Sequence, residues 1–444
     1  MKIAVVGAGW AGMAAALAAT QAGHHAIVFE AARAVGGRAR ALNSTLSDGT
    51  PVVLDNGQHI LIGAYSQTLE LMKRVGVDAS QALLRLPLNL RFPDSKGLAL
   101  PDWTSPLDAL GGMLMARGWT LSDKWSLLRA ATGWQLQRFQ CAPQTSVAQL
   151  CAGLTPRVLQ TLIEPLCVSA LNTPTRRASG QVFLTVLRDS LFGGRGSSNL
   201  LLPRVDLSAL FPQAAAEWLQ HHGGDVRLGV RVDGLRVGLQ WNGLRKPGDT
   251  PQWQVQGESF DRVIWATSSS NAAQALAEAA QSAPDSIASS MRQWAGCAES
   301  LQFEAIATVY AWGQNARLRQ PMLSLYSQAS TASTGSAAPA QFVFDRGQLG
   351  GPPGLLAFVV SASSDTKEVL QAQVLQQART QLGLALEPVQ TVVEKRATFA
   401  CIPALVRPAM HIAPGLLACG DYIEGPYPAT LEGAVRSGWA AGSG

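Results

Sequence analysis

The sequence contains little that would support disulfide bonds, metal ligation or membrane crossing. Its 444 residues include six cysteines, none of which forms a C-x-x-C pair or stands at zinc spacing from a histidine. We therefore predict reduced, buried thiols in a cytoplasmic protein, and no metal site. No run of about 18 apolar residues occurs, so no helix is expected to span a bilayer.

Charged residues are also scarce, at 15% of the chain. The net charge is +5, but Lys and Arg are scattered, which argues against nucleic-acid binding and allows weak attraction to anionic lipid. Because 47% of the residues are hydrophobic, a chain of this length can bury the cores of two domains, and disorder as a class is excluded.

The first forty residues carry the clearest functional pattern. Residues 3–6 form an apolar run typical of a buried parallel strand, and they lead into G-x-G-x-x-G at Gly7, Gly9 and Gly12, with Ala11 inside the motif. The first glycine permits a tight turn, the second lets a pyrophosphate approach the backbone, and the third lets the next helix pack closely. The sequence therefore predicts a dinucleotide at the N-terminus of a helix.

The continuation distinguishes the cofactor. A second strand ends at Glu30, which follows Gly12 by 18 residues, close to the roughly 20 expected for a carboxylate that binds ribose hydroxyls. Gly37 and Arg38 come next in a G-G-R stretch, where they can add a donor and a positive charge to the same pyrophosphate. This stretch resembles the motif of the FAD-dependent amine oxidase and carotenoid desaturase superfamily.

The C-terminus predicts the other half of the same site. Residues 416–419 form an apolar strand that leads into Gly420 and Asp421, and a last helix begins near Ala429 and Thr430. A strand end can present Asp421 to the ribityl hydroxyls of a flavin, while the helix N-terminus offsets negative charge on the reduced ring.

Residues 98–140 allow two interpretations. Their tryptophans are Trp103, Trp119, Trp125 and Trp134. Two or three amphipathic helices with aromatic and basic residues are typical of a membrane-surface element. Helices that roof a substrate domain have a similar pattern, and Asp102, Asp108 and Asp123 favour this second interpretation because they dilute the positive charge.

Four further stretches resemble the hydroxysqualene dehydroxylase family, also called squalene-associated FAD-dependent desaturases. They are LDNGQH (54–59), EPLCVSALNTP (164–174), LLPRVDL (201–207) and PATLEGA (428–434). The resemblance implies an α/β fold: a Rossmann-type FAD-binding domain with an inserted α+β substrate domain and a helical, membrane-facing region. The implied FAD-binding parts are residues 1–80, 201–270 and 401–444, with Val232 beside the adenine. The helical region would cover 81–200 and the substrate domain 271–400.

The activity implied by this resemblance is reductive removal of the hydroxyl of hydroxysqualene, a long-chain isoprenoid, with non-covalent FAD. Contact with the inner membrane would suit such a substrate, and the electron donor is not indicated. The reaction needs hydride from reduced flavin and a proton for the leaving hydroxyl. We expect His59 to supply this proton, with Asp55 keeping the imidazole protonated, and we rank Tyr422 and Tyr427 next.

The residues alone leave alternatives open. A carotenoid-type desaturase or an amine oxidase would carry the same cofactor motifs. A non-catalytic prenyl-chain binder on the same fold belongs to another class of protein.

Overall fold

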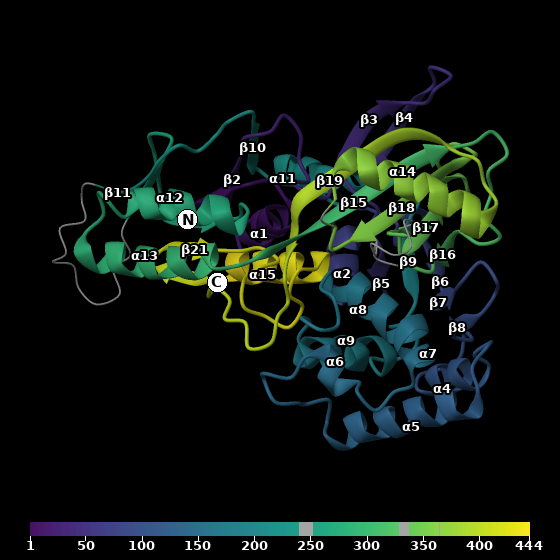
Figure 1. Cartoon of the computed structure of the whole chain (residues 1–444). Helices are drawn as coiled ribbons and strands as arrows, with labels where there is room; N and C mark the ends of the chain where they lie inside the picture. Colours follow the sequence, from purple (N-terminus) through teal and green to yellow (C-terminus); the bar gives the residue numbers. More distant parts are fainter. Residues whose placement is uncertain (239–251, 328–336, 364) are drawn as a thin grey trace.

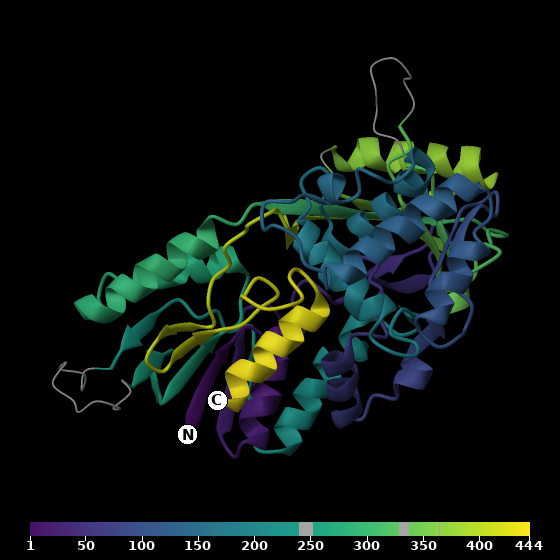
Figure 2. The same cartoon turned by 90° about the horizontal axis from the view of Figure 1, so that it is seen from below.

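The computed structural model describes residues 1–238, 252–327, 337–363 and 365–444. Figure 1 shows a nucleotide-binding part around helices α1 and α15, a second sheet covered by α14, and a group of helices that includes α4 to α9. Both chain termini lie together at the nucleotide-binding end, as the view from below in Figure 2 confirms.

The nucleotide-binding part is built on a six-stranded sheet. Its strand order is β10 (Asp225–Leu228), β2 (His25–Glu30), β1 (Lys2–Val6), β14 (Arg262–Trp265), β21 (Leu416–Ala418) and β20 (His411–Ala413). All neighbouring strands are parallel except β20 and β21. The carboxyl ends of the parallel strands therefore meet at one edge, which is where open α/β sheets bind their ligands.

Helix α1 (Trp10–Gln21) packs between this sheet and α15 (Leu431–Ser443), and all its residues from Trp10 to Ala19 are buried. This burial on every side explains its alanine-rich sequence. On α15, a Cβ at Gly438 would come within 2.0 Å of the carbonyl oxygen of Ala11, so the two helices can approach only through small residues. Helices α10 (Leu207–Leu210) and α11 (Pro212–His221) complete this layer.

The second sheet is antiparallel and has five strands. Their order is β16 (Met322–Ser324), β17 (Phe342–Asp345), β18 (Leu355–Ser361), β15 (Phe303–Trp312) and β19 (Glu387–Phe399). Side chains alternate between its two faces: Val343 and Phe358 pack with α14 (Lys367–Gln377), whereas Phe342, Phe344 and Val359 line a cavity on the other face.

The helical part follows β3 (Ala41–Thr45) and β4 (Pro51–Asp55) along the chain. Helix α2 (Ser66–Arg74) packs against α15 and is followed by α3 (Ala79–Ala82). The helical part then contains α4 (Leu107–Leu114), α5 (Leu121–Leu136), α6 (Val147–Leu150), α7 (Pro156–Val158), α8 (Glu164–Leu171) and α9 (Gly180–Leu191). Strand β5 (Leu61–Ile62) precedes α2, and β9 (Leu200–Pro203) follows α9. Between α3 and α4 lie β6 (Leu83–Leu86), β7 (Asn89–Arg91) and β8 (Gly97–Ala99). In the part of the chain that the structure describes, no helix is both long and apolar enough to cross a membrane.

The α/β fold with a Rossmann-type FAD-binding domain and a second domain is confirmed. The exact domain boundaries remain a prediction, and one placement differs from expectation. Helices α12 (Ser269–Ala279) and α13 (Asp285–Glu299), expected in the substrate domain, pack against β11 (Leu235–Val237) and β20 on the nucleotide-binding side. The short sheet of β11, β12 (Trp253–Val255) and β13 (Glu258–Phe260) lies there as well.

Candidate cofactor and substrate cavity

A cavity of about 1040 Å³ runs between the two sheets. Of the residues predicted to bind the cofactor, those that line it are Gly7, Gly9, Ala11, Glu30, Gly37, Arg38, Val232, Gly420, Asp421, Ala429 and Thr430. The structure therefore brings residues from both ends of the chain to one site, as the motifs predict. Gly12 does not line the cavity, and its role is in packing.

The three motif glycines have three different reasons to be glycine. Gly7 has φ +111°, a conformation that L side chains rarely adopt. A Cβ at Gly12 would lie 1.9 Å from the carbonyl oxygen of Gly7, which α1 must approach closely. A Cβ at Gly9 would meet only the Cα of Gly37, at 4.0 Å. Protein packing does not require glycine at position 9, so its open space fits a cofactor pyrophosphate.

Glu30 lies at the end of β2 with its carboxylate fixed by the backbone. Its oxygens accept from the N–H groups of Ala8 and Ala32, both at 2.8 Å. These bonds hold the carboxylate beside the glycine turn, and each oxygen keeps a lone pair for a ribose hydroxyl. The arrangement fits the predicted role of Glu30.

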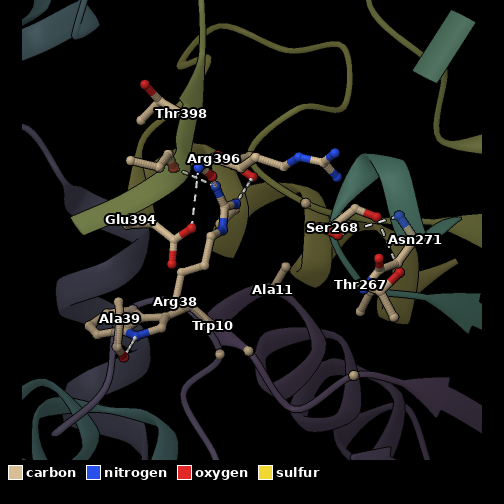
Figure 3. A pocket seen from close by; sticks show the side chains of 18 of the residues that line it. Trp10, Ala11, Arg38, Ala39, Thr267, Ser268, Asn271, Glu394, Arg396 and Thr398 are labelled. Atoms are coloured by element: carbon tan, nitrogen blue, oxygen red, sulfur yellow. Dashed lines mark hydrogen bonds and ion pairs between the residues drawn. The ribbon is translucent and has the colours of Figure 1, made fainter. Parts of the chain in front are cut away.

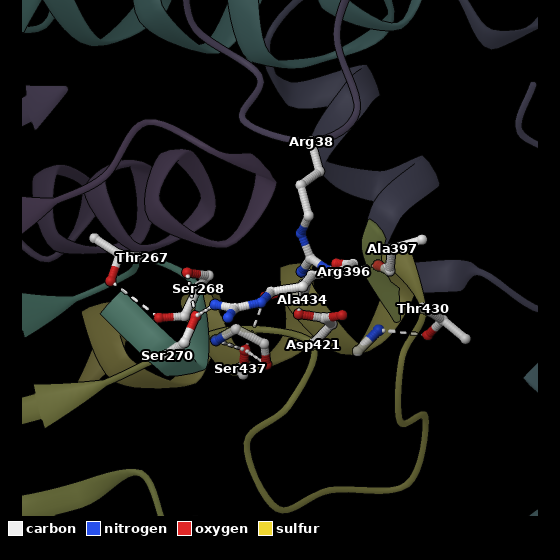
Figure 4. A network of polar contacts seen from close by, with 12 residues as sticks. Arg38, Thr267, Ser268, Ser270, Arg396, Ala397, Asp421, Thr430, Ala434 and Ser437 are labelled. Carbon is white, nitrogen blue, oxygen red and sulfur yellow. Dashed lines mark hydrogen bonds and ion pairs between the residues drawn. The ribbon is translucent and has the colours of Figure 1, made fainter. Parts of the chain in front are cut away.

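Arg38 and Asp421 form an ion pair that joins the two halves of the site, with 2.6 Å between Nη2 and Oδ1 (Figure 4). Arg38 also donates to the carbonyl oxygens of Arg396 and Ala397 on β19, at 3.2 and 2.5 Å. The carboxylate of Asp421 raises the pKa of Arg38. The guanidinium thus pairs with the C-terminal half of the site, and its contact with the pyrophosphate remains a prediction.

The N-terminus of α15 is held in place by two of its own side chains. Thr430 is the N-cap, since its Oγ1 accepts from the N–H of Gly433 at 3.0 Å. The fully buried carboxylate of Glu432 accepts from the N–H groups of Gln67 and Thr68, at 3.0 and 2.9 Å. Glu432 therefore caps α2 from the opposite end of the chain, a role that the sequence does not reveal.

Asp55 is buried beneath the loop that follows β4, and the prediction that it would hold His59 protonated is wrong. One carboxylate oxygen accepts from the N–H of Leu207 at 2.8 Å, and the other lies 3.9 Å from Nη2 of the buried Arg346. Burial raises the pKa of Asp55 to about 6. Its side chain thus anchors the loop to the chain near Leu207 and does not act on the imidazole.

His59 lies on the cavity wall at the end of this loop. Its Nδ1 is 2.8 Å from the carbonyl oxygen of Gly57. Since a carbonyl can only accept, Nδ1 carries the proton and Nε2 of the neutral ring is an acceptor. Burial, and to a smaller extent the charge of Arg38, lowers the pKa of His59 below 6.5. The imidazole is therefore mainly neutral at pH 7.

The two predicted reserve proton donors do not reach the cavity. Tyr422 is buried edge-on against Trp294, and its hydroxyl has no hydrogen-bond partner among the described residues. Burial raises the pKa of Tyr422 well above 10. Tyr427 donates to Asp189 at 2.9 Å and points away from the cavity lining. Sequence adjacency to Asp421 was a poor guide, because Tyr422 packs into the protein interior and Tyr427 is directed to Asp189.

Sequence reasoning missed several ionisable residues of the cavity wall, among them Tyr65 and Glu394; the others include Asp233, Arg236, Glu278 and Arg396. Tyr65 precedes α2, and burial raises its pKa above 10. Glu394 lies on β19 across from Arg38, with 3.5 Å between its Oε2 and Nδ2 of Asn56 (Figure 3). Nothing in the sequence marks these residues, because a β-strand position and a helix start become cavity wall only through tertiary packing.

One wall of the cavity is mainly apolar. Its apolar side chains come from α8, β15, β17 and β18, with Ser169 and Ser361 beside them: Val168, Leu171, Ile306, Phe342, Phe344 and Val359. The stretch EPLCVSALNTP fixes this wall, because α8 ends at Asn172 in a left-handed conformation. In the side-chain amide of Asn172, Nδ2 donates to Oγ1 of Thr398 at 2.9 Å, and Oδ1 accepts from the N–H of Ala362 at 3.0 Å. The motif thus joins a helix to two strands of the substrate sheet.

Residues 10–442 match the flavin containing amine oxidoreductase family, and the chain belongs to that family. It is an FAD-dependent oxidoreductase. None of the six cysteines lines the cavity, which is the position that a thioether link to the flavin would need.

Among curated relatives, the chain is similar to hydroxysqualene dehydroxylases. It is 26% identical to that of Rhodopseudomonas palustris and 23% identical to that of Sinorhizobium fredii, over 98% of this chain and 96% of each relative. A shorter match, 33% identical over 27% of this chain, is to a carotenoid phi-ring synthase of Streptomyces griseus.

Solved structures support the fold. An oxidoreductase from Methanosarcina mazei superposes with a TM-score of 0.69 at 16% identity, covering 99% of both chains. Putrescine oxidase bound to putrescine gives a TM-score of 0.65 at 16% identity, over all of this chain and 98% of the oxidase.

Proposed function

We propose that this enzyme removes the hydroxyl group of hydroxysqualene reductively and releases squalene. The observation that carries the proposal is the apolar wall of the cavity, which continues directly from the FAD-binding end. A hydrocarbon chain gains about 25 cal/mol for each Å² of apolar surface buried against such a wall. The full-length similarity to hydroxysqualene dehydroxylases supports the same assignment.

The overall reaction balances with one hydride and one proton. The C–OH bond breaks, a C–H bond forms at the same carbon, and the hydroxyl leaves as water. Reduced FAD supplies the hydride when it is bound, as flavins do in other oxidoreductases. Gly9, Glu30, Asp421 and Thr430 would hold the cofactor, and the remaining task of the protein is to orient the hydroxyl and to control its proton.

His59 is the residue that we propose for this task. Its neutral Nε2 can accept a hydrogen bond from the substrate hydroxyl and so orient it. Once protonated, the same nitrogen can donate to the leaving oxygen. The anchored position of Asp55 keeps the loop in place without raising the pKa of the imidazole. Tyr65 and Glu394 are the alternative proton sources in the wall.

The proposed substrate is a C30 hydrocarbon alcohol that resides in bilayers, so we also propose that the protein contacts a membrane surface.

A polyene desaturase remains the second candidate function, because the same apolar wall suits a carotenoid chain and shorter matches include zeta-carotene and phytoene desaturases. The two functions require opposite directions of electron flow.

Anaerobic stopped-flow absorption separates them. Enzyme with photoreduced FAD is mixed with detergent-solubilised hydroxysqualene, and oxidised enzyme is mixed with phytoene or with putrescine. The proposal predicts that the absorbance of oxidised flavin returns in the first mixture and that it does not change in the second. Bleaching of the flavin by phytoene would establish the desaturase instead.

A further inference from the structure

The outer surface of α4 and α5 is apolar. Among the described residues, nine of the fifteen exposed large apolar side chains lie between positions 103 and 136: Trp103, Leu107, Leu110, Leu114, Met115, Leu121, Trp125, Leu128 and Leu136. We call this set the α4–α5 face. A cluster of this kind marks an interaction site, whereas isolated exposed apolar residues need no explanation.

The spacing shows that each helix presents one apolar stripe outward. On α4 the exposed leucines are three and four residues apart, at Leu107, Leu110 and Leu114. On α5, Leu121, Trp125 and Leu136 are 85%, 67% and 81% exposed, and they share one side of the helix. Lys124 donates to the carbonyl oxygen of Leu114 and brings the two stripes together.

The inner side of α5 buries polar groups beside the indole of Trp134. Asp123 and Ser126 are buried there, and Asp123 closes a capping box with Thr120 and accepts from Thr155 at 2.6 Å. A helix that buries its acid and exposes its leucines does not simply roof a domain. Its outer side is shaped to meet an apolar phase or a partner.

The exposed charges around the α4–α5 face indicate what kind of partner it binds. Asp108 and Asp123, the residues that argued against a membrane role in the sequence, are only 4% and 5% exposed. The basic residues Arg117, Arg129 and Arg138 are exposed. Between residues 101 and 140, Asp102 is the one acidic residue on the surface. The α4–α5 face is therefore apolar at its centre, and the exposed charges of the same region are mainly positive.

We propose that the α4–α5 face docks this enzyme on a bilayer containing anionic phospholipid. The inference rests on the proposed function, because the hydrocarbon substrate must leave a bilayer to reach the cavity. A second copy of the chain fits the face less well, since a symmetric dimer would bring the arginines of both copies together. In Figure 1, α5 lies at the lower edge of the molecule, away from the nucleotide-binding sheet.

Not every tryptophan of this region belongs to the face. Trp119 and Trp134 are buried, and Trp119 donates to Oγ1 of Thr161 at 3.1 Å. A variant at Trp119 would therefore disturb packing and would not test docking. The informative positions are Leu121, Trp125 and Leu136.

The test is flotation of the FAD-loaded full-length protein with lipid vesicles. One vesicle contains equal parts of phosphatidylglycerol and phosphatidylcholine, and the other contains phosphatidylcholine alone. The variant L121S/W125S/L136S is compared with V53S/V369S/V406S, which removes three exposed valines elsewhere on the surface. Flavin content and thermal unfolding verify that both variants are folded.

The proposal predicts that wild type and the valine variant float with the anionic vesicles. The L121S/W125S/L136S variant should bind them at least about tenfold more weakly. Raising the salt concentration from about 0.1 M to about 1 M should weaken wild-type binding, because the Debye length falls from roughly 10 Å to 3 Å. Equal flotation of both variants, or no flotation of wild type, would overturn the proposal.

Two further readouts complete the design. If gel filtration shows a wild-type dimer that the L121S/W125S/L136S variant converts to a monomer, a second copy covers the face and the bilayer assignment is wrong. Flavin reoxidation by detergent-solubilised hydroxysqualene needs no vesicle. Its absence in a protein that floats would refute the proposed reaction alone, and its presence in a protein that does not float would refute docking alone.

Discussion

The two ends of the cavity are built in different ways. At the cofactor end, backbone groups at strand ends and helix starts form the site, and glycines keep it open. At the substrate end, side chains from α8, β15, β17 and β18 form the wall. The first construction depends on local sequence and is repeated across flavoproteins, whereas the second depends on which faces the sheet and helices present to each other. The cofactor end should therefore respond to single glycine changes, and the substrate end to changes in side-chain contacts.

The largest expected effect on activity is at Gly9, because loss of the cofactor would abolish all flavin chemistry. Gly9→Val places a side chain where protein atoms leave open space, so the fold should survive while FAD binding falls at least about 100-fold, or ~2.7 kcal/mol. Isothermal titration of the deflavinated protein with FAD measures this change. Gly296→Ala, in a helix position where a Cβ would meet nothing within 4 Å, is the matched control and should bind normally. Normal affinity in Gly9→Val would mean that the pyrophosphate lies elsewhere.

The next effect concerns chemistry at the junction of the two ends. His59→Ala should slow flavin reoxidation by hydroxysqualene about 10²–10⁴-fold, the usual contribution of a general acid, with FAD binding unchanged. Because the pKa of His59 is lowered, the wild-type rate should rise as the pH falls from 8 towards 6, and the variant should lose this slope. If the rate of the variant is within a few-fold of wild type, His59 is not the proton donor, and Glu394 or Tyr65 takes that role.

A third effect, on stability and not on the reaction, is expected at Asp55, beneath the loop that follows β4. Burial raises the pKa of Asp55 from 3.8 to about 6, so the folded state binds its proton more tightly than the unfolded state does. This group therefore stabilises the protein at low pH and loses that contribution as the pH rises through 6, by up to about 3 kcal/mol. In urea unfolding, the free energy of unfolding should fall less for Asp55→Asn than for wild type when the pH is raised from 4.5 to 7.5. Parallel pH profiles for the two proteins would show that Asp55 titrates normally.

The smallest effect is at the wall of the substrate end. Asn172→Ala removes two hydrogen bonds and should cost about 1–3 kcal/mol of stability. Asn172→Gly loses the same bonds but adopts the left-handed conformation freely, so it should be about 1 kcal/mol more stable than the alanine variant. Thermal unfolding compares them, and FAD should be retained in both. The reverse order of stability would mean that backbone conformation does not matter here.

The glycine motifs and the final strand and helix predict the cofactor end because each residue acts through its own backbone. The ion pair of Arg38 with Asp421 and the capping of α2 by Glu432 could not be predicted, since each joins segments more than 360 residues apart. The same limit explains the errors at Asp55, Tyr422 and Tyr427. Their neighbours in sequence suggested a shared site, but Asp55 bonds to Leu207, Tyr427 bonds to Asp189, and Tyr422 packs against Trp294.

The amphipathic pattern of residues 98–140 gave the helices but not their orientation. Sequence composition counted Asp108 and Asp123 as surface charges, and the structure buries both. Only tertiary packing shows which side of α5 faces outward. The outward side of α5 distinguishes a helix that only covers the substrate domain from one that can dock on a surface.

The most direct test of the account is the direction of electron flow between flavin and an isoprenoid. Anaerobic mixing of the photoreduced enzyme with hydroxysqualene should restore oxidised flavin absorbance in proportion to the squalene formed, with the rate depending on His59. A flavin that stays reduced with hydroxysqualene, but is reduced from its oxidised state by a polyene or an amine, would contradict it.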